Sequence, residues 1–287
     1  MIIDISEWQH PDQINYAQLA KQIDHVIVRI QYGSAYCDKY YQTHLQRFQD
    51  LGIPTAVYAW VRGTSQADMA QEARTFYERA KIFQPSFYWL DVEEQSMADM
   101  RGGVEVYRQT LKKLTNQKVG VYVAHHLYRQ FNLAVDRFDA LWLPSYGQNT
   151  GSYQGVDPTV SKQYDLHQYT SNGRLAGYNG VLDLNRLSGK KALSYFTGKT
   201  GSPAAWGIAE KGYFTLGSAI HLRTAPSTSA QSIAVLPAGS VVQYDAFAHE
   251  QGYVWIRQKR SDGTYAYLAT GKSDGKKRTD ASWGIFN

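Results

Sequence analysis

Residues 87–94 read FYWLDVEE, a run of apolar and aromatic side chains that ends in three carboxylates. This bias towards aromatic and branched residues predicts a strand that is buried on both faces. Side chains alternate along a strand, so Asp91 and Glu93 should project side by side from one face. Burying two unpaired negative charges costs on the order of several kcal/mol. The pair therefore indicates either a strand end that frays into a polar loop or a site where solvent, a cation or a reaction needs it.

Strand-like and helical patterns alternate along the chain up to about residue 190. The strand-like runs are 2–6, 25–30, 55–60, 87–93, 119–125, 140–146, 165–170 and 181–185. Helical patterns follow the first five runs, most clearly after Ser65, which can cap a helix with Asp68 three residues later. Repeated β-α-β units build parallel sheets, and eight strands close naturally into a barrel. The sequence predicts an α/β fold, an irregular (β/α) barrel of eight strands with missing late helices. An open doubly wound sheet is the alternative.

Carboxylates stand at several of the predicted strand ends. Asp4 lies in the first strand, Asp91 and Glu93 in the fourth, and Asp183 in the eighth. Barrel active sites form at the carboxyl ends of the strands, so these four side chains should meet in one mouth. A frayed strand end explains only the pair in the fourth strand. The convergence therefore favours a functional site, which would perform acid–base chemistry on a sugar or bind a divalent metal.

A metal would require histidine or further oxygen ligands in the same mouth. His125 and His126 at the end of the fifth strand and His167 in the seventh keep that alternative open, although no HExxH or HxH spacing supports it. The single cysteine, Cys37, excludes an intrachain disulfide and any site built from several cysteines. We assign no metal and no cofactor.

The length and charge of the chain suit a large barrel with a small basic module. The chain has 287 residues and a net charge of +5, with 20 Lys/Arg against 19 Asp/Glu up to residue 195 and 10 against 6 thereafter. An excess of this kind favours a polyanionic surface. The basic residues are not organised on a recognition helix, so nucleic-acid binding is not expected. The apolar start MIIDIS lacks a signal-peptide pattern, and no run approaches a membrane span, so we expect accumulation in the cytoplasm without membrane insertion.

The last third of the chain changes character. Residues 191–205 are rich in Gly, Ser, Thr and Lys, which predicts a linker between a domain at 1–190 and one at 206–287. Alternating runs within 219–270, with a Ser-Asp-Gly turn at 261–263, predict four or five short strands in a small all-β barrel. Neither segment carries a catalytic constellation.

The first 188 residues resemble glycoside hydrolase family 25, the muramidases known as Chalaropsis-type lysozymes. The motifs that carry the resemblance are, in order, DISEWQ, VRIQYGSAYCDKYY, GIPTAVYAW, LDVEE, VGVYVAHHLY, LWLPSYG, HQYTSNG and GVLDLNRL. The resemblance implies a barrel of five βα units plus three strands that cleaves the β-1,4 bond between N-acetylmuramic acid and N-acetylglucosamine. It implies that Glu93 is the general acid and that Asp91, Asp4 and Asp183 complete the catalytic set. The part that Asp91 plays, as nucleophile, base or partner of the substrate acetamido group, stays open.

Further polar and aromatic residues lie near the predicted strand ends, where rings can stack on sugars and polar groups can bind their substituents. These candidate substrate-binding residues are Arg29, Tyr58, Arg62, Tyr122, Trp142, Tyr146 and Gln168. Tyr122 and Trp142 are the foremost of them. About half of the set should prove to be core or loop packing.

Residues 206–287 resemble the bacterial SH3-type domains that bind cell walls, down to the closing Ala269-Thr270-Gly271 and Trp283-Gly284-Ile285-Phe286 elements. Aromatic side chains that could line a peptide groove there are Tyr213, Tyr244, Tyr253, Trp255 and Tyr267. Several of these rings must instead be core, because so small a module has few other large side chains to bury.

Together these features predict a modular peptidoglycan hydrolase of the phage endolysin type. Its partners would be the glycan strand at the barrel mouth and a wall peptide or wall polymer at the SH3-like domain. A separate pore-forming protein would release it from the cytoplasm. The alternatives are a catalytically silent wall-binding protein and a hydrolase of another polysaccharide.

Overall fold

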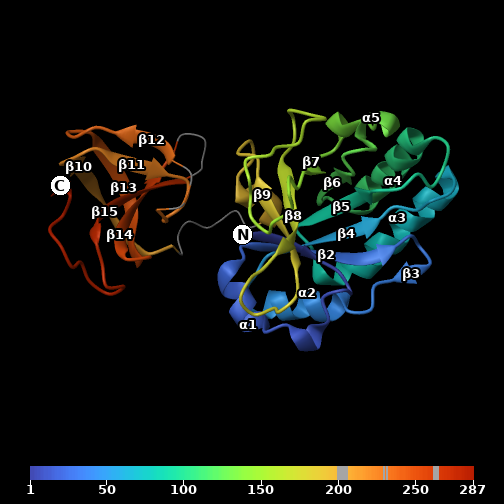
Figure 1. Ribbon diagram of the computed structural model, residues 1–287, viewed down its shortest axis with the longest axis horizontal. Helices are drawn as coiled ribbons and strands as arrows, with labels where there is room; N and C mark the ends of the chain where they lie inside the picture. The colour runs from blue at the N-terminus through green and yellow to red at the C-terminus, as the bar shows by residue number, and fades with distance from the viewer. Residues whose placement is uncertain (199–205, 229, 231, 261–264) are drawn as a thin grey trace. The chain divides into compact units, whose positions relative to one another are not determined.

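The computed structural model describes residues 1–198, 206–228, 230, 232–260 and 265–287, which fall into two compact units (Figure 1). The first unit spans Met1–Thr200 and the second Gly201–Asn287. None of the helices in the described ranges is long and apolar enough to cross a lipid bilayer.

The first unit is built on a closed barrel. Its strands are β1 (Ile2–Ile5), β2 (His25–Tyr32), β4 (Thr55–Trp60), β5 (Phe87–Val92), β6 (Lys118–Val123), β7 (Ala140–Pro144), β8 (Leu166–Gly173) and β9 (Leu182–Leu187), with a short β3 (Tyr36–Cys37) beside β2. Neighbours follow the order β1-β9-β8-β7-β6-β5-β4-β2, and β1 also pairs with β2. That last pairing closes the barrel of eight strands and overturns the open-sheet alternative. The barrel strands β1, β2 and β4 to β8 pair in parallel, whereas β9 is antiparallel to both β8 and β1, and the short β3 is antiparallel to β2.

The longer helices of this unit all precede β6, and only short helical segments follow it. The helices are α1 (Tyr16–Leu19), α2 (Tyr41–Asp50), α3 (Gln66–Ala80), α4 (Met100–Leu114), α5 (Tyr128–Phe131) and α6 (Leu193–Thr197), with 3-10 turns η1 (Pro11–Gln13), η2 (Ala20–Gln22), η3 (Lys81–Phe83) and η4 (Val135–Arg137). Ser65 caps α3 as predicted, because its hydroxyl accepts the Asp68 amide at 3.2 Å. No helix lies between β7 and β8 or between β8 and β9, which confirms the missing late helices.

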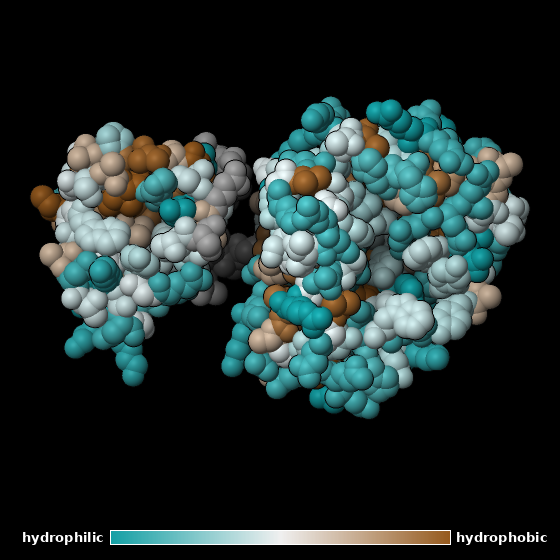
Figure 2. Space-filling model, in the orientation of Figure 1, coloured by the Kyte–Doolittle hydropathy of each residue, from teal (hydrophilic) through white to brown (hydrophobic). Residues whose placement is uncertain are grey.

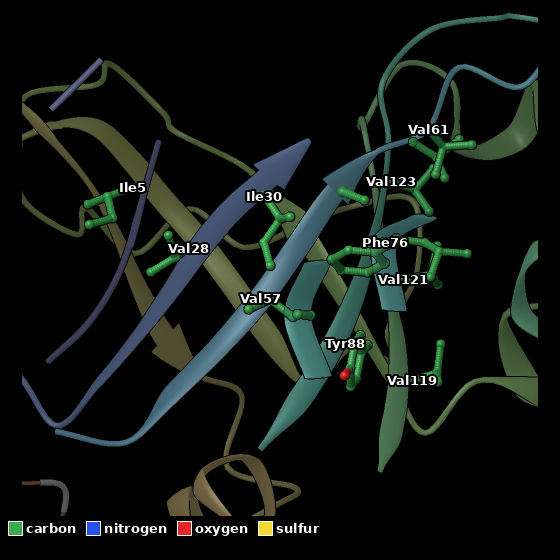
Figure 3. Close-up of a cluster of buried hydrophobic side chains, with 14 of the residues drawn as sticks. Ile5, Val28, Ile30, Val57, Val61, Phe76, Tyr88, Val119, Val121 and Val123 are labelled. Carbon is green, nitrogen blue, oxygen red and sulfur yellow. The ribbon is translucent and has the colours of Figure 1, made fainter. Parts of the chain in front are cut away.

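Two apolar layers stabilise the barrel. The outer layer lies between strands and helices, where Phe76 of α3 packs edge-on against Tyr88 of β5 with ring centroids 5.3 Å apart (Figure 3). The inner layer fills the barrel around Trp89, which is fully buried. Gly120 of the neighbouring β6 makes room for that indole, because a Cβ at this position would lie 2.3 Å from the ring.

The chain continues to pack on the barrel beyond residue 190, which corrects the start of the predicted linker. Phe196 of α6 is fully buried in the inner layer, and its ring stacks on Trp89 at 6.2 Å between centroids. The Tyr195 hydroxyl donates to the Asp139 carbonyl at 2.9 Å. The small and polar residues of this segment predicted flexibility, but Phe196 packs into the inner apolar layer. We call this end of the barrel, where Phe196 contacts Phe87 and Trp89, the barrel floor. The rest of the expected linker, 199–205, lies outside the described residues.

The second unit is a sheet of seven antiparallel strands. They are β10 (Ile208–Leu216), β11 (Ile220–Arg223), β12 (Ser232–Leu236), β13 (Val241–Glu250), β14 (Tyr253–Lys259), β15 (Tyr265–Lys272) and β16 (Gly284–Phe286), in the order β12-β11-β15-β14-β13-β10-β16. The all-β prediction is confirmed, with more strands than expected, and the predicted turn at 261–263 lies outside the described residues. Phe214, Leu222 and Ile256 lie in the hydrophobic core of this second unit. A hydrophobic patch is visible on this unit, whereas the larger unit presents a mostly hydrophilic face (Figure 2).

Candidate active site

A cleft of about 270 Å³ opens in the first unit at the carboxyl ends of the parallel strands. Its lining side chains are Asp4, Ser6, Trp8, Arg29, Tyr58, Trp60, Asp91, Glu93, Tyr122, Trp142, Tyr146, Gln168, Ser171 and Asp183. All four predicted catalytic carboxylates are therefore brought together in one place. Six of the seven predicted substrate-binding residues line the same cleft.

Asp183 reaches the cleft by a different route from the one the sequence suggested. We expected it at the carboxyl end of a parallel strand, but it is the second residue of β9, which runs antiparallel to β1. The start of an antiparallel strand lies beside the end of its neighbour, so Asp183 faces Asp4 directly across the pair.

Burial controls the protonation of the Asp91 and Glu93 pair. Asp91 is buried, whereas Glu93 is half-buried at the opening of the cleft. Burial raises the pKa of Glu93 to about 7. Burial first, and then the neighbouring Glu93 and Asp4, raise the pKa of Asp91 well above its usual range. The free site therefore holds protons on this pair at mildly acidic pH, and Glu93 is the member that a ligand can reach.

Asp4 and Asp183 differ in their hydrogen-bond partners. Asp4 accepts the Gln168 Nε2 amide at 3.1 Å and the Asn185 Nδ2 amide at 2.7 Å. Burial raises the pKa of Asp4 to about 6, against the lowering effect of these donors. Burial and the nearby Asp4 charge raise the pKa of Asp183 to about 8. The negative charge of this second pair therefore resides on Asp4.

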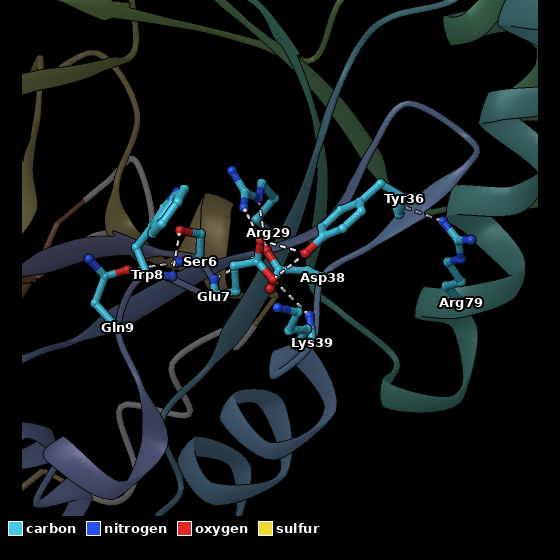
Figure 4. A network of polar contacts seen from close by, with 9 residues as sticks. All are labelled: Ser6, Glu7, Trp8, Gln9, Arg29, Tyr36, Asp38, Lys39 and Arg79. Carbon is cyan, nitrogen blue, oxygen red and sulfur yellow. Dashed lines mark hydrogen bonds and ion pairs between the residues drawn. The ribbon is translucent and has the colours of Figure 1, made fainter.

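A polar network holds Arg29 at the edge of the cleft (Figure 4). The Arg29 Nε donates to Asp38 Oδ2 at 2.8 Å, and a terminal nitrogen lies 3.5 Å from Glu7 Oε1. The Tyr36 hydroxyl donates to Glu7 at 2.7 Å, and the Glu7 amide donates to Asp38. This network fixes the loop after β1, which carries Trp8, relative to β2.

The two foremost predicted stacking rings have a different role from the one expected. Tyr122 and Trp142 are buried, with 4% and 2% of their surfaces exposed, so neither can lie flat against a sugar in this arrangement. The Trp142 Nε1 donates to Asn185 Oδ1 at 2.8 Å, and the Tyr122 hydroxyl donates to Gln168 Oε1 at 3.0 Å. Both rings still line the cleft, so their contact with substrate stays a prediction, while their burial reflects how closely the inward side chains of a narrow barrel pack on one another.

Arg62 is the predicted binding residue that does not line the cleft. Its Nε forms an ion pair with Glu94 Oε1 at 2.6 Å, and its guanidinium lies 4.4 Å from the centre of the Tyr32 ring. Arg62 lies two residues after the end of β4, whose last residue, Trp60, still lines the cleft.

Sequence reasoning missed several cleft residues. Ser6, Trp8, Trp60 and Ser171 line the cleft, and Asn185 contacts Asp4 from behind it. Trp8 is the most exposed aromatic ring there, at 76%. Its place four residues after Asp4 was the available signal, because a loop that follows a catalytic strand borders the same mouth.

The histidines that kept a metal site open lie elsewhere. His125, His126 and His167 are not among the residues that line the cleft. The buried His167 instead contacts the Ser145 carbonyl through Nε2 at 2.8 Å. Within the described ranges, no group of three or more His, Cys, Asp or Glu side chains is arranged to bind a metal ion.

The model of glycosyl hydrolases family 25 matches residues 3–178, which is more than half of the chain and includes Asp4, Asp91 and Glu93. The chain belongs to this family. A bacterial SH3 domain model matches residues 206–270. The molecule is thus a family 25 glycoside hydrolase, a lysozyme-type peptidoglycan hydrolase, joined to a bacterial SH3 domain.

Solved structures agree with this membership. A family 25 hydrolase of Streptococcus pneumoniae, described as a virulence factor in host cell invasion, is 36% identical; the match covers 68% of this chain and 92% of that one, with a TM-score of 0.66. The catalytic domain of endolysin ply40 from Listeria monocytogenes bacteriophage P40 is 26% identical over 66% and 92%, with a TM-score of 0.60. A Streptomyces coelicolor lysozyme, 19% identical over 68% and 96% with a TM-score of 0.56, shares the fold. No curated protein matches the chain.

The SH3 domain of this family 25 enzyme has an aromatic pocket of about 400 Å³. Tyr253, Trp255 and Trp283 line it, together with His221 and Arg223. Two of the predicted wall-binding rings, Tyr253 and Trp255, are therefore placed at a cavity. Trp283, which belongs to the closing Trp-Gly-Ile-Phe motif, is the third ring.

The other three predicted wall-binding rings lie away from that pocket. Tyr213 is half-exposed on β10, and Tyr267 packs edge-on against Trp206 at 5.0 Å between centroids. Tyr244 is a core residue, not an exposed ring, and its hydroxyl donates to Glu210 at 2.8 Å. The small domain buries this tyrosine because it has few other large side chains with which to fill its centre.

A second pocket of about 400 Å³ on the SH3 domain is basic. It is lined by Glu210, Phe247, His249, Val254, Lys276, Lys277, Arg278 and Phe286. Asp274 shapes the turn that carries the cations, because its Oδ1 accepts the backbone amides of Lys276 and Lys277 at 2.9 Å. Three adjacent positive side chains thus face a cavity that also contains aromatic rings.

Proposed function

We propose that the enzyme is an N-acetylmuramidase that cleaves the β-1,4 bond between N-acetylmuramic acid and N-acetylglucosamine in peptidoglycan. The observation that carries this proposal is the Glu93 carboxyl, half-buried in a cleft of four carboxyl groups, with a pKa raised to about 7. A carboxyl group that is protonated near neutral pH can donate to a poor leaving group. Family membership supports the same choice of substrate.

In the proposed reaction, Glu93 donates its proton to the glycosidic oxygen while the bond from that oxygen to the anomeric carbon breaks. The electron pair leaves with the oxygen, and positive charge develops on the anomeric carbon. Negative charge on Asp4 and the carboxyl of Asp91 stabilise this charge from within the cleft. Water then adds to the sugar, and its proton returns to the Glu93 carboxylate.

The decisive experiment replaces Glu93 by Gln, which removes the proton and keeps the shape of the side chain. We expect turnover of purified peptidoglycan to fall by about 10² to 10⁴-fold. Asp91→Asn should also be severely impaired. The adjacent Glu94→Gln is the matched control, because Glu94 pairs with Arg62 and does not line the cleft.

Mass analysis of the released fragments then tests the bond. A new reducing end on N-acetylmuramic acid supports a muramidase. A new reducing end on N-acetylglucosamine, or equal turnover of chitin oligomers, would contradict it. Near-normal lysis by a folded Glu93→Gln protein would remove the assignment of the acid.

We also propose an endolysin role, in which the protein accumulates in the bacterial cytoplasm during phage infection and a separate pore-forming protein releases it to the wall. Similarity to the phage endolysin supports this role. Expression in a susceptible host should cause lysis only when a pore-forming protein is expressed with it. Lysis by this chain alone would contradict the need for a separate release protein.

The SH3 domain is proposed to hold the enzyme on the wall through its two pockets. The partly exposed rings of the aromatic pocket, Tyr253 and Trp283, suit a wall peptide, while Trp255 is buried at 1% exposure and forms the wall behind them. The cations around Lys276, Lys277 and Arg278 suit an anionic wall polymer, and the rings beside them suit its sugar or acyl parts.

A further inference from the structure

Among the four cleft carboxyl groups, Asp4 accepts hydrogen bonds from two side-chain amides. Gln168 Nε2 lies 3.1 Å from each of its oxygens, and Asn185 Nδ2 lies 2.7 Å from one of them. All three side chains are buried. Asp91, by contrast, has a buried oxygen with no partner among the described residues. Asp4 and Asp91 are both buried aspartates of the same cleft, but only Asp4 has amide donors on its carboxyl oxygens.

The orientation of both amides is fixed from behind by aromatic side chains. An indole N–H can only donate, so the Asn185 atom that faces Trp142 Nε1 at 2.8 Å must be the amide oxygen. The NH₂ group of Asn185 is thereby directed at Asp4. Gln168 Oε1 accepts the Tyr122 hydroxyl at 3.0 Å and the Tyr146 hydroxyl at 2.5 Å, and the carboxylate of Asp4, which can only accept, faces the NH₂ group at the other end of the amide.

Donors of this kind favour the ionised form of a carboxyl group and oppose the effect of burial. Their absence at Asp183 leaves that residue with a pKa of about 8, whereas the pKa of Asp4 is raised only to about 6. The charge that results at Asp4 in turn helps to raise the pKa of Asp91 and Glu93.

We propose that Asn185 and Gln168 are positioning residues that hold Asp4 as the resident anion of the cleft and so keep the Glu93 carboxyl protonated for catalysis. Trp142, Tyr122 and Tyr146 act one step further back by directing the two amides. The proposal rests on the proposed function, in which Glu93 donates the proton.

The charged and titratable groups around Asp4 come from every side of the cleft. Asp183 on β9 and the Asp91 and Glu93 pair on and after β5 are acidic; Arg29 on β2 is the cation. The phenols of Tyr58, Tyr122 and Tyr146 stay neutral at working pH, because burial raises each pKa. Loss of an amide donor therefore leaves Asp4 among three carboxyls, and its pKa must rise.

The test uses Asn185→Leu, which removes the donor, and Asn185→Asp, which replaces it with a further acidic group. In both full-length variants, the acidic limb of the kcat/KM profile should move to higher pH, by about one to two units for Asn185→Leu. Trp142→Phe removes the indole N–H that orients Asn185 but leaves the Asn185 amide in place. It should move the acidic limb in the same direction by a smaller amount. A merely structural defect would lower kcat at every pH and leave the limb in place.

The control is Thr170→Val in the same strand as Gln168. Thr170 is fully buried, and its hydroxyl donates to Asn149 rather than to a carboxyl group. The limb should not move in this variant, whatever its kcat.

A second measurement does not depend on turnover. Carbon-13 NMR of the carboxyl groups should show a higher Asp4 pKa in Asn185→Leu than in the parent chain, also when both carry Glu93→Gln. If Glu93→Gln stayed active, the proposed function would fail while this titration still tested the amides. An unchanged Asp4 pKa in folded Asn185→Leu and Trp142→Phe would overturn the proposal.

Discussion

Asp4 and Asp183 lie directly opposite each other on the antiparallel strands β1 and β9. Side chains in such a position point to the same face, with Cβ atoms about 4.5 to 5.5 Å apart. Two buried carboxyl groups this close cannot both ionise cheaply, so one of them keeps its proton. The amides of Gln168 and Asn185 decide which one, because their NH₂ groups donate to Asp4 and not to Asp183.

The first prediction concerns the pH dependence of turnover. The pKa of Glu93 is raised to about 7, so the proton donor is present below that pH and lost above it. Asp4, with a pKa of about 6, carries its charge above that pH and loses it below. We expect a bell-shaped kcat/KM profile with its maximum between about 6 and 7, measured on soluble glycan fragments. A rate that keeps rising towards pH 9 would contradict the assignment of Glu93.

The second prediction tests the floor of the barrel. Phe196→Ala leaves a cavity beside Trp89 and should lower the free energy of unfolding of the first unit by about 3–5 kcal/mol. Ile82→Ala, at a 69% exposed position, should change it by less than about 0.5 kcal/mol. Calorimetry can separate the transitions of the two units. Equal melting of the Phe196→Ala protein and its parent would show that α6 is dispensable.

The third prediction separates binding from chemistry. A chain truncated after residue 200 keeps Phe196 and should turn over soluble fragments like the full-length enzyme, while its lysis of intact cells falls. Tethering raises the local substrate concentration without changing the transition state. A chain truncated after residue 190 loses α6 and should be less stable. Equal loss on both substrates by the folded longer chain would mean that the SH3 domain helps to form the active site.

The fourth prediction tests the basic pocket. Lys276→Gln/Lys277→Gln should weaken binding to walls that carry anionic polymers and reduce its salt dependence, most clearly below about 0.15 M salt. Lys259→Gln/Arg260→Gln is the matched control, because the pairing of Lys259 with Tyr265 places it at the opposite end of the β14–β15 hairpin from Lys272. Binding of the two variants is compared on walls before and after chemical removal of anionic polymers. An equal effect of both charge changes would indicate net charge alone.

The fifth prediction concerns metals. Because the candidate histidines lie outside the cleft, incubation with a chelator should leave the rate on peptidoglycan unchanged. A loss of activity that a divalent ion restores would favour the metal alternative.

Much of the barrel was predictable because its cause is local. Apolar runs such as 87–92 form strands wherever they are buried, and the Ser65 hydroxyl caps α3 through contacts within four residues. The position of Asp91 and Glu93 at the end of one strand was also enough to predict that both lie at the barrel mouth. The direction of β9 was not predictable in this way, because a strand pattern reads the same in either direction.

The sequence by itself determined the strands, the caps and the carboxylates, since spacing along one strand fixes which side chains share a face. Only the tertiary structure decided that Trp142 directs Asn185 instead of stacking on a sugar, and that Asp4 rather than Asp183 carries the charge. It also decided that Phe196 belongs to the barrel and that Tyr244 belongs to a core. These outcomes depend on burial and on contacts between residues far apart in the chain, and burial is a property of the folded interior that no short stretch of sequence contains.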